Sequence, residues 1–230
     1  GGDQTIKKIK KHQSKNRVVD VSFGDKYSFC VLQSESINKI LPTELKRLTE
    51  QFYNDTYIMD QNACSSPHLI IWLGKDNNIK KAKKIFWNQL IEHIKKRYII
   101  DEVNVIDKYK QFCSDAIEFN YIDQFHSDEN LIYRIKINKL PKNLENLKGK
   151  FGYFYEYHSK DINCCARLIN PKFQTLTYFG LDKRRLSNFI ISNRLRGIDR
   201  IVPIGQALDI GLTWDGYNID KSLTRIIDLK

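Results

Sequence analysis

The sequence lacks long apolar runs and the short motifs of the common cofactor and metal sites. No run approaches the roughly 18 apolar residues that a membrane-spanning helix needs. The polar and basic first residues contain no apolar segment typical of a signal peptide. The Gly-x-Gly-x-x-Gly, Walker A and His-Glu-x-x-His motifs are absent as well. We therefore expect no membrane span and no resident metal ion.

Cysteine is scarce, and its spacing suits neither a disulfide framework nor a zinc site. The cysteines are odd in number, and no two have the Cys-x-x-Cys spacing. They are Cys30, Cys64, Cys113, Cys164 and Cys165. Free thiols of this kind are typical of the reducing cytoplasm, which is the compartment we expect.

Methionine occurs once, at Met59, and the chain begins with Gly-Gly-Asp. We therefore expect a processed or partial chain, with part of the protein upstream of Gly1. The chain has 230 residues, of which 41% are hydrophobic. This is enough for one large domain or two small domains with a buried core.

Acidic residues are outnumbered by basic ones. The chain has 38 lysines and arginines against 27 aspartates and glutamates, which leaves a net charge of +11. Such a charge suits nucleic acid, a phosphorylated cofactor, coenzyme A or an acidic protein. It also arises from a lysine-rich composition that has no binding function. Because the lysines are spread along the chain without a nucleic-acid-binding motif, we expect no nucleic-acid partner.

Predicted strands and helices alternate along most of the chain. Apolar or alternating runs predict strands at residues 18–22, 27–33, 68–73, 131–137, 151–157 and 174–179, and a strand end at 201–205. Apolar stripes at helical spacing predict helices at residues 5–11, 42–53, 78–97, 107–118 and 184–196. The polar residues 123–130 predict a loop. The expected fold class is α/β, with a largely parallel sheet flanked by helices.

The stretch at residues 60–67 (DQNACSSP) places Cys64 among small and polar residues, before the predicted buried strand 68–73. A nucleophilic cysteine needs positive potential or a lowered thiol pKa, and room for a substrate. The small neighbours give room, and backbone N–H groups of a sharp turn would stabilise an oxyanion. His68 is a candidate partner, although a strand leaving the site can point its ring elsewhere. From these residues alone, Cys64 is either a nucleophile or a small core residue.

Six segments occur in an order typical of one enzyme family. They read GGDQTI at residues 1–6, FGDKYS at 23–28, DQNACSSP at 60–67, QTLT at 174–177, DRIVPIG at 199–205 and WDGY at 214–217. Together they resemble the LuxC-type acyl-CoA reductases, which belong to the aldehyde dehydrogenase superfamily. The cysteine stretch is the most specific of the six.

The resemblance implies that the chain is the C-terminal catalytic half of such an enzyme. Residues 1–17 would be the end of a cofactor-binding domain whose remainder lies upstream. Residues 18–200 would form the aldehyde-dehydrogenase-like catalytic domain, and residues 201–230 a C-terminal segment returning toward the cofactor domain. Gly1, Gly2 and Asp3 would lie at a helix start near the cofactor. The resemblance also implies a homo-oligomer.

The resemblance assigns Cys64 as the nucleophile of a reductive reaction. Its thiolate would attack a fatty acyl-CoA or acyl-protein thioester and displace the thiol. A hydride from NADPH, with NADH as the alternative, would reduce the S-acyl enzyme to a fatty aldehyde. The Cys64 backbone N–H, with Asn62 and Ser65, would hold the oxyanion or position the substrate, and Phe151 would lie at the cofactor. An acyl-protein synthetase is the implied protein partner.

Two departures from the aldehyde-oxidising relatives bear on the reaction. Ser22 stands where those enzymes have the glutamate that activates water, and a lone hydroxyl does not serve as that base. Its loss would protect an acyl-enzyme meant for reduction. If Phe151 and Gly152 match the Glu-x-Phe-Gly-Pro motif, Gly149 replaces the glutamate that holds the nicotinamide ribose, so we assign no ribose-binding residue. The alternative function is a non-catalytic basic binding module that keeps the same fold.

Overall fold

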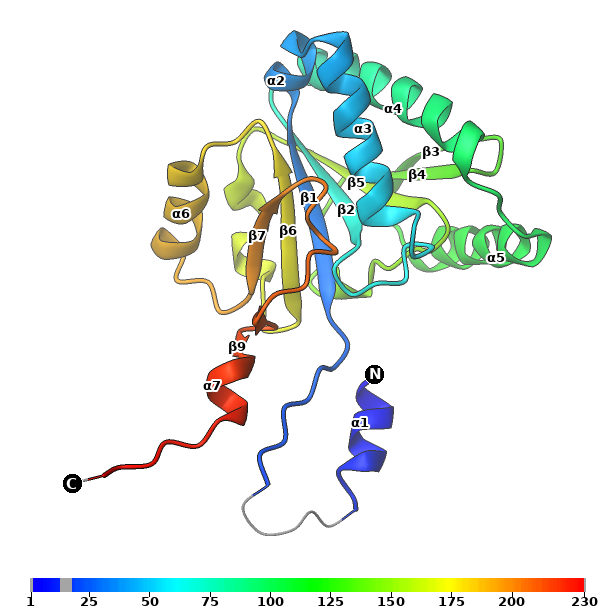
Figure 1. Cartoon of the computed structure of the whole chain (residues 1–230). Coiled ribbons are helices and arrows are strands. Elements are labelled where there is room, and N and C mark those ends of the chain that lie inside the picture. The colour runs from blue at the N-terminus through cyan, green and yellow to red at the C-terminus, as the bar shows by residue number, and fades with distance from the viewer. Residues whose placement is uncertain (1, 13–17, 230) are drawn as a thin grey trace.

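The centre of the structure is a seven-stranded sheet. The computed structural model describes residues 2–12 and 18–229. The strands lie in the order β3-β4-β5-β2-β1-β6-β7, and neighbours are parallel except β3 and β4. Their bounds are Tyr27–Gln33 (β1), Pro67–Leu73 (β2), Ile122–Asp128 (β3), Ile132–Ile137 (β4), Tyr153–Ser159 (β5), Phe173–Phe179 (β6) and Arg200–Pro203 (β7). The expected α/β fold with a largely parallel sheet is confirmed (Figure 1).

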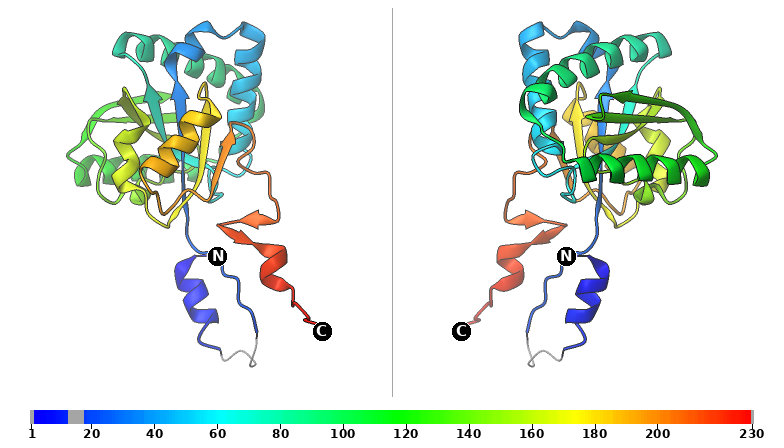
Figure 2. Two further views of the ribbon diagram at one scale, coloured as in Figure 1. Left: turned by 90° about the vertical axis from the view of Figure 1, so that its left-hand side faces the viewer. Right: turned by 90° about the vertical axis from the view of Figure 1, so that its right-hand side faces the viewer.

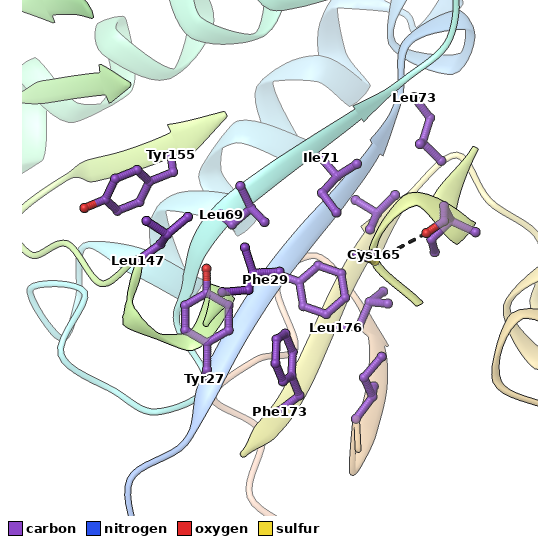
Figure 3. Close-up of a cluster of buried hydrophobic side chains, with 14 of the residues drawn as sticks. Tyr27, Phe29, Leu69, Ile71, Leu73, Leu147, Tyr155, Cys165, Phe173 and Leu176 are labelled. Carbon is purple, nitrogen blue, oxygen red and sulfur yellow. Dashed lines mark hydrogen bonds between the residues drawn. The ribbon is translucent and has the colours of Figure 1, made fainter. Parts of the chain in front are cut away.

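The central strands β1 and β2 are buried on both faces because each is an apolar run. Successive residues of a strand point to opposite faces of the sheet. Leu69, Ile71 and Leu73 therefore join the core on one face, whereas Ile70 and Trp72 join the core on the other. Figure 3 shows the first of these cores packed across β2, β1 and β6.

Helices cover both faces of the sheet, as the crossovers between parallel strands require. One face is covered by α2 (Ser34–Lys39), α3 (Pro42–Thr56) and α4 (Asp76–Arg97). The other face is covered by α5 (Glu102–Glu118), α6 (Lys183–Ser192) and the 3-10 helices η1 (Leu144–Asn146) and η2 (Ile162–Leu168). Among the described residues, no helix has the length and apolar character to cross a membrane.

Two terminal segments extend from the end of the sheet at which β1 and β2 begin (Figures 1 and 2). The N-terminal segment contains α1 (Asp3–Ile9) and the extended residues 18–26. The C-terminal segment contains β8 (Thr213–Trp214), β9 (Tyr217–Asn218) and α7 (Ile219–Leu223). The two segments lie at the same end of the molecule.

The prediction of a strand at residues 18–22 is wrong. Val18 and Val19 favour an extended backbone, but both are exposed, and none of the described strands pairs with them. A β-strand needs a neighbour for its N–H and C=O groups, so extended conformation alone does not make one.

The prediction of a loop at residues 123–130 is also wrong, because β3 lies there. This strand is at the edge of the sheet and all but its first and last residues are exposed. Edge strands accommodate charged side chains, so a polar composition was misleading at this position. The helix predicted at residues 184–196 ends at Ser192, close to Arg194, whose φ angle of 49° is not helical.

Candidate active site

The cysteine stretch forms a tight loop between α3 and β2, at the end of the sheet where β2 begins. Two consecutive residues, Asp60 and Gln61, have positive φ angles of 51° and 58°. The Gln61 N–H donates to the Thr56 carbonyl at 2.7 Å. Cys64 is exposed, and the Ser28 hydroxyl donates to its carbonyl at 2.6 Å. The loop therefore holds Cys64 at the surface while fixing its backbone to β1.

The buried side chain of Gln61 joins the cysteine loop to the start of β5. Its Oε1 accepts the N–H groups of Gly152 at 3.2 Å and Tyr153 at 2.9 Å. Its Nε2 donates to the carbonyls of Pro67 at 3.0 Å and Tyr153 at 2.9 Å. The amide thus uses its two donors and both acceptor positions. The cysteine loop and the start of β5 are held as one hydrogen-bonded unit.

His68, the candidate partner of Cys64, is committed to a different contact. It is buried, its ring stacks on Tyr27, and its Nδ1 accepts the Gly149 N–H at 3.3 Å. Burial lowers the pKa of His68 to about 3, with a further contribution from the Lys148 charge, so the ring is neutral near pH 7. His68 therefore holds the backbone at Gly149 in place.

Cys64 lies in a wall shared by two cavities. We call the first, of about 590 Å³, the polar cavity and the second, of about 510 Å³, the apolar cavity. Cys64, Ala63 and Asp25 line both. The lysines of the polar cavity are Lys26, Lys108, Lys110, Lys148 and Lys150. The apolar lining of the second cavity comes from Phe23, Met59, Leu208, Ile210 and Trp214.

The polar cavity has a positive lining, since its five lysines are accompanied by two aspartates, Asp25 and Asp107. Lys108 is buried, and its ammonium group donates to the carbonyls of Asn130 and, at 2.8 Å, Phe151. Burial lowers the pKa of Lys108 to about 7. Phe151 has a φ angle of 58°, which is rare for an aromatic residue. Lys108 therefore anchors a strained part of the cavity wall.

The apolar cavity is formed by segments far apart in the sequence. Phe23 comes from the extended residues before β1, Met59 from the cysteine loop, and Leu208 and Ile210 from the loop after β7. Trp214 belongs to β8. Five of the six segments that carry the family resemblance thus have at least one residue in the lining of this cavity.

The remaining predicted residues of the cysteine loop lie on different sides of it. Asn62 lines the polar cavity, and its side-chain amide donates to the Asp60 carbonyl at 3.1 Å. Ser65 is buried and lines the apolar cavity. Phe151 and Gly149 line the polar cavity together with Asn62. The structure thus brings Asn62, Ser65 and Phe151 to the surroundings of Cys64.

The predicted N-terminal cofactor residues lie beside the segment that precedes β1. Gly2 lines the apolar cavity, whereas Gly1 lies outside the described residues. The Asp3 N–H donates to Asp25 Oδ2 and the Asp25 N–H donates to Asp3 Oδ1, both at 3.0 Å. The Ser22 hydroxyl donates to Asp20 at 2.5 Å, and Ser22 lines neither of the two cavities.

Four polar residues that organise the site were not predicted from the sequence: Asp55, Gln61, Lys108 and Arg200. One signal was present, because Asp55 continues the apolar face of its helix one turn after Phe52 and close to Tyr53. The roles of the others depend on partners distant in the sequence, which periodicity does not reveal.

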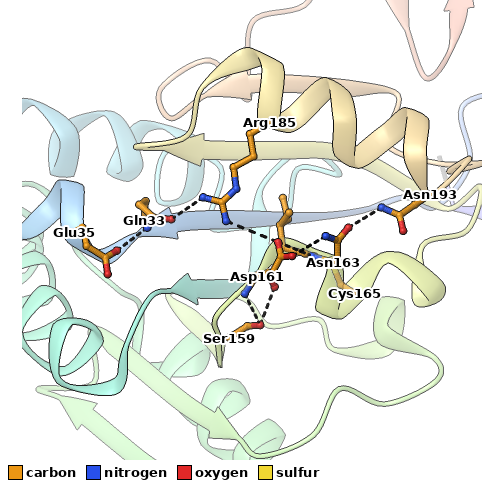
Figure 4. A network of polar contacts seen from close by, with 9 residues as sticks. Gln33, Glu35, Ser159, Asp161, Asn163, Cys165, Arg185 and Asn193 are labelled. Carbon is orange, nitrogen blue, oxygen red and sulfur yellow. Dashed lines mark hydrogen bonds and ion pairs between the residues drawn. The ribbon is translucent and has the colours of Figure 1, made fainter.

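A second polar network lies at the opposite end of the sheet, where β1 and β5 end (Figure 4). Arg185 donates to Gln33 Oε1 at 3.5 Å and lies 3.8 Å from Asp161 Oδ1. These groups contact one another, and none lines either cavity at Cys64. Within the part of the chain that the structure describes, no cluster of histidine, cysteine, aspartate or glutamate side chains could hold a metal ion.

Solved structures similar to this one include dehydrogenases of aldehydes and of 1-pyrroline-5-carboxylate. Methylmalonate-semialdehyde dehydrogenase from Oceanimonas doudoroffii has a TM-score of 0.52 and 10% identity, over 82% of this chain and 40% of that chain. A mutant 1-pyrroline-5-carboxylate dehydrogenase from Thermus thermophilus has a TM-score of 0.49 and 9% identity, over 78% and 36%. A benzaldehyde dehydrogenase from Corynebacterium glutamicum has a TM-score of 0.45 and 14% identity, over 78% and 39%. The first shows an aldehyde-dehydrogenase fold; the chain spans well under half the length of each.

A family model supplies the identification. No curated protein matches the chain. The model of the acyl-CoA reductases (LuxC), in contrast, matches residues 1–226. Because that match spans nearly the whole sequence, the chain belongs to the LuxC acyl-CoA reductase family.

Proposed function

We propose that this chain carries the acyl-accepting cysteine of an enzyme that reduces fatty acyl thioesters to aldehydes. The observation that carries the proposal is the position of Cys64. It is exposed in the wall between a lysine-lined cavity and an apolar cavity. A fatty acyl-CoA has the matching build, with a phosphate-bearing head and a hydrocarbon tail on either side of the reacting carbonyl.

The first step is acyl transfer to Cys64. The acyl chain occupies the apolar cavity, where Phe23, Leu208 and Trp214 remove its methylene groups from water. Cys64 releases its proton to solvent, its Sγ attacks the thioester carbonyl, and a new C–S bond forms. The bond to the leaving thiol breaks, and that thiolate is protonated on the polar side. The Cys64 N–H is the proposed oxyanion donor, with Asn62 and Ser65 positioning the loop.

The second step needs a reduced nicotinamide cofactor, and the residues present fit one. The lining of the polar cavity combines lysines with the strained Phe151 beside Cys64. Lys26 is ion-paired with Asp199 at 2.9 Å. Once the leaving thiol has vacated the polar cavity, Lys148 and Lys150 would hold phosphate groups of the cofactor, and Phe151 would contact the ring. When bound, NADPH, or NADH, supplies the hydride that reduces the acyl carbon. Cleavage of the Cys64–acyl bond would then release the aldehyde and restore the Cys64 thiolate.

Protection of the acyl-enzyme from water is consistent with the surroundings of Cys64. Ser22, at the place of the oxidising relatives' base, is hydrogen-bonded to Asp20 and lies outside both cavities. His68 lines the polar cavity with Cys64, but its Nδ1 accepts the Gly149 N–H and burial lowers its pKa to about 3. A ring of such low basicity is a poor base for the attack of water on the thioester.

The organisation of the whole enzyme is part of the same proposal. Residues 1–17 would close a cofactor-binding domain, residues 18–200 form the catalytic domain, and residues 201–230 return toward the cofactor. The acyl donor is coenzyme A or a protein thiol, the latter supplied by an acyl-protein synthetase, and the enzyme is a homo-oligomer. Because the proposed cofactor-binding domain lies largely upstream of Gly1, activity is measured on the full-length protein.

The proposal is tested by acyl labelling. Incubation of the full-length protein with radiolabelled long-chain acyl-CoA, without reduced cofactor, should place one acyl group on Cys64. Cys64→Ala should remove the label, whereas Cys113→Ala, a half-buried thiol on α5, should keep it. Labelling that persists in Cys64→Ala would overturn the assignment of Cys64 as the acyl-accepting residue.

A basic binding module without catalysis makes a different prediction. In a catalytic protein, prior incubation of the full-length chain with acyl-CoA should protect Cys64 from iodoacetamide, because the acyl group occupies the thiol. Absent acyl labelling, together with absent protection, favours the binding module.

A further inference from the structure

We propose that Asp55 and Arg200 set the acyl-chain selectivity of the apolar cavity by holding one of its walls between them. The inference rests on the proposed function, since it assigns the apolar cavity to the acyl chain. Neither residue lines that cavity, so both are positioning residues. They act through the loop after β7, residues 205–210, which contributes Leu208 and Ile210 to the lining.

Asp55 holds the N–H groups of this loop. Its carboxylate is buried and accepts from the Gly205 N–H at 2.6 Å and from the Ala207 N–H at 2.9 Å. Gly205 has a φ angle of 97°, and a Cβ there would lie 2.8 Å from the Gln51 side chain. The close approach of the loop to α3 therefore depends on glycine at this position.

Arg200 holds the carbonyl groups of the same loop. Its guanidinium donates to the carbonyls of Ala207 at 3.1 Å, Gln206 at 3.0 Å and Asp209 at 2.8 Å. The guanidinium also lies over the Trp214 ring, 4.5 Å from its centroid. Trp214 lines the apolar cavity, so one side chain fixes two separate parts of the lining.

The loop thus lies between an anion that binds its N–H groups and a cation that binds its carbonyls. Charge-assisted hydrogen bonds are stronger than neutral ones, so the five contacts hold the loop firmly. Leu208 lies between Ala207 and Asp209, both of which are bonded, and its place in the lining is set by them. The Asp55 carbonyl also accepts the Ser66 hydroxyl at 2.7 Å. The distance from the wall to the cysteine loop is therefore fixed through the same residue.

Arg200→Lys is the variant that separates selectivity from folding. A lysine keeps the charge but does not bridge three carbonyls or stack as a plane on Trp214. In the full-length enzyme we expect kcat/KM for dodecanoyl-CoA to fall about tenfold, the effect of losing contact with one or two methylene groups. The value for butanoyl-CoA, whose shorter chain contacts less of the wall, should change less than about twofold. Arg196→Lys, at an exposed position, is the matched control and should change neither.

Asp55→Asn gives an independent measurement if Arg200→Lys does not fold. An amide can accept one of the two N–H groups but presents its own N–H to the other. The same loss of long-chain preference is expected. An equal loss for both thioesters, or no change in either variant, overturns the inference. A failure of the proposed function is distinguishable, because the wild-type enzyme would then not be acylated by butanoyl-CoA either.

Discussion

At the scale of single residues, Lys108 shows how the fold holds a charged group inside the protein. Its ammonium group lies 4.7 Å from the centroid of the Tyr133 ring, and its donors are used by Asn130 and Phe151. A buried lysine with two carbonyl acceptors and no carboxylate partner is easier to deprotonate than one in water. This is why burial lowers its pKa to about 7.

The pKa of Lys108 predicts a pH dependence of stability. Its pKa in the folded state lies below the unfolded value of about 10.4, so the unfolded chain binds more protons between the two values. The free energy of unfolding should therefore rise with pH between about 7 and 10.4, and the group adds no pH dependence below about 7. The expected slope in that window is about 1.4 kcal/mol per pH unit.

Urea unfolding of the wild type and Lys108→Met at three pH values between about 7 and 9 measures this slope. The methionine variant should lack it, although its overall stability is lower because two carbonyls lose their donor. Lys110→Met, exposed on the same helix, should keep the wild-type slope. A slope unchanged in Lys108→Met would show that another group titrates in this range.

At the scale of elements, the entry into β5 has no room for a side chain at Gly152. Gly152 has a φ angle of 81°, and a Cβ there would lie 2.4 Å from both the Leu131 carbonyl and the Tyr57 hydroxyl. A side chain at this position therefore meets backbone that cannot move away, as well as an unfavourable φ angle.

Gly152→Ala should destabilise the protein by about 3 kcal/mol or prevent its folding. Gly211→Ala is a matched control, since a Cβ there meets no atom within 4 Å. It should alter the free energy of unfolding by less than about 0.5 kcal/mol. Thermal melting of the two variants beside the wild type provides the comparison. Equal melting temperatures for both variants would contradict the packing described around Gly152.

The elements that could be predicted are those whose apolar pattern decides their burial. β1, β2 and α4 lie within two residues of the predicted ranges. The two strands are short continuous apolar runs, and the apolar residues of α4 recur at helical spacing. The predictions for β3 and for residues 18–22 were wrong for opposite reasons. The first is a polar strand at an edge, and the second is an apolar stretch with no neighbour among the described strands. Pairing between strands is a tertiary property, which a window of sequence does not contain.

The candidate site was predictable to a similar extent. The resemblance pointed to the cysteine loop, and the structure places Asn62, Ser65 and Phe151 around it. The contacts that hold this arrangement were not predictable. Gln61 bonds to Tyr153, 92 residues away, through a backbone turn of positive φ at a residue other than glycine. No local pattern indicates such a turn.

At the scale of the whole molecule, part of the surplus positive charge lies at the polar cavity. Five of the basic residues that give the net charge of +11 face it. Acyl transfer from a phosphate-bearing thioester should therefore depend on salt, because ions screen such attraction over about 10 Å at 0.1 M.

The rate of Cys64 labelling by acyl-CoA should fall several-fold between about 0.05 M and 0.5 M salt. Labelling by the acyl thioester of N-acetylcysteamine, which has no phosphate, should change little. Lys148→Gln combined with Lys150→Gln should reduce the salt dependence for acyl-CoA, whereas Lys81→Gln, exposed on α4, should leave it intact. Identical salt dependence for the two thioesters would argue against a role for these lysines.

The thiol in a wall between two cavities of opposite character has one more consequence. A molecule that is oily at one end and ionic at the other can lie across Cys64 in a single sense. The site therefore selects the orientation of a bound molecule by the polarity of its two ends, before any group contacts the carbonyl. Soaps and other anionic detergents share this two-ended build, with a head group whose charge is opposite to that of the lysines. They would therefore mimic the proposed substrate in outline without offering a bond to break.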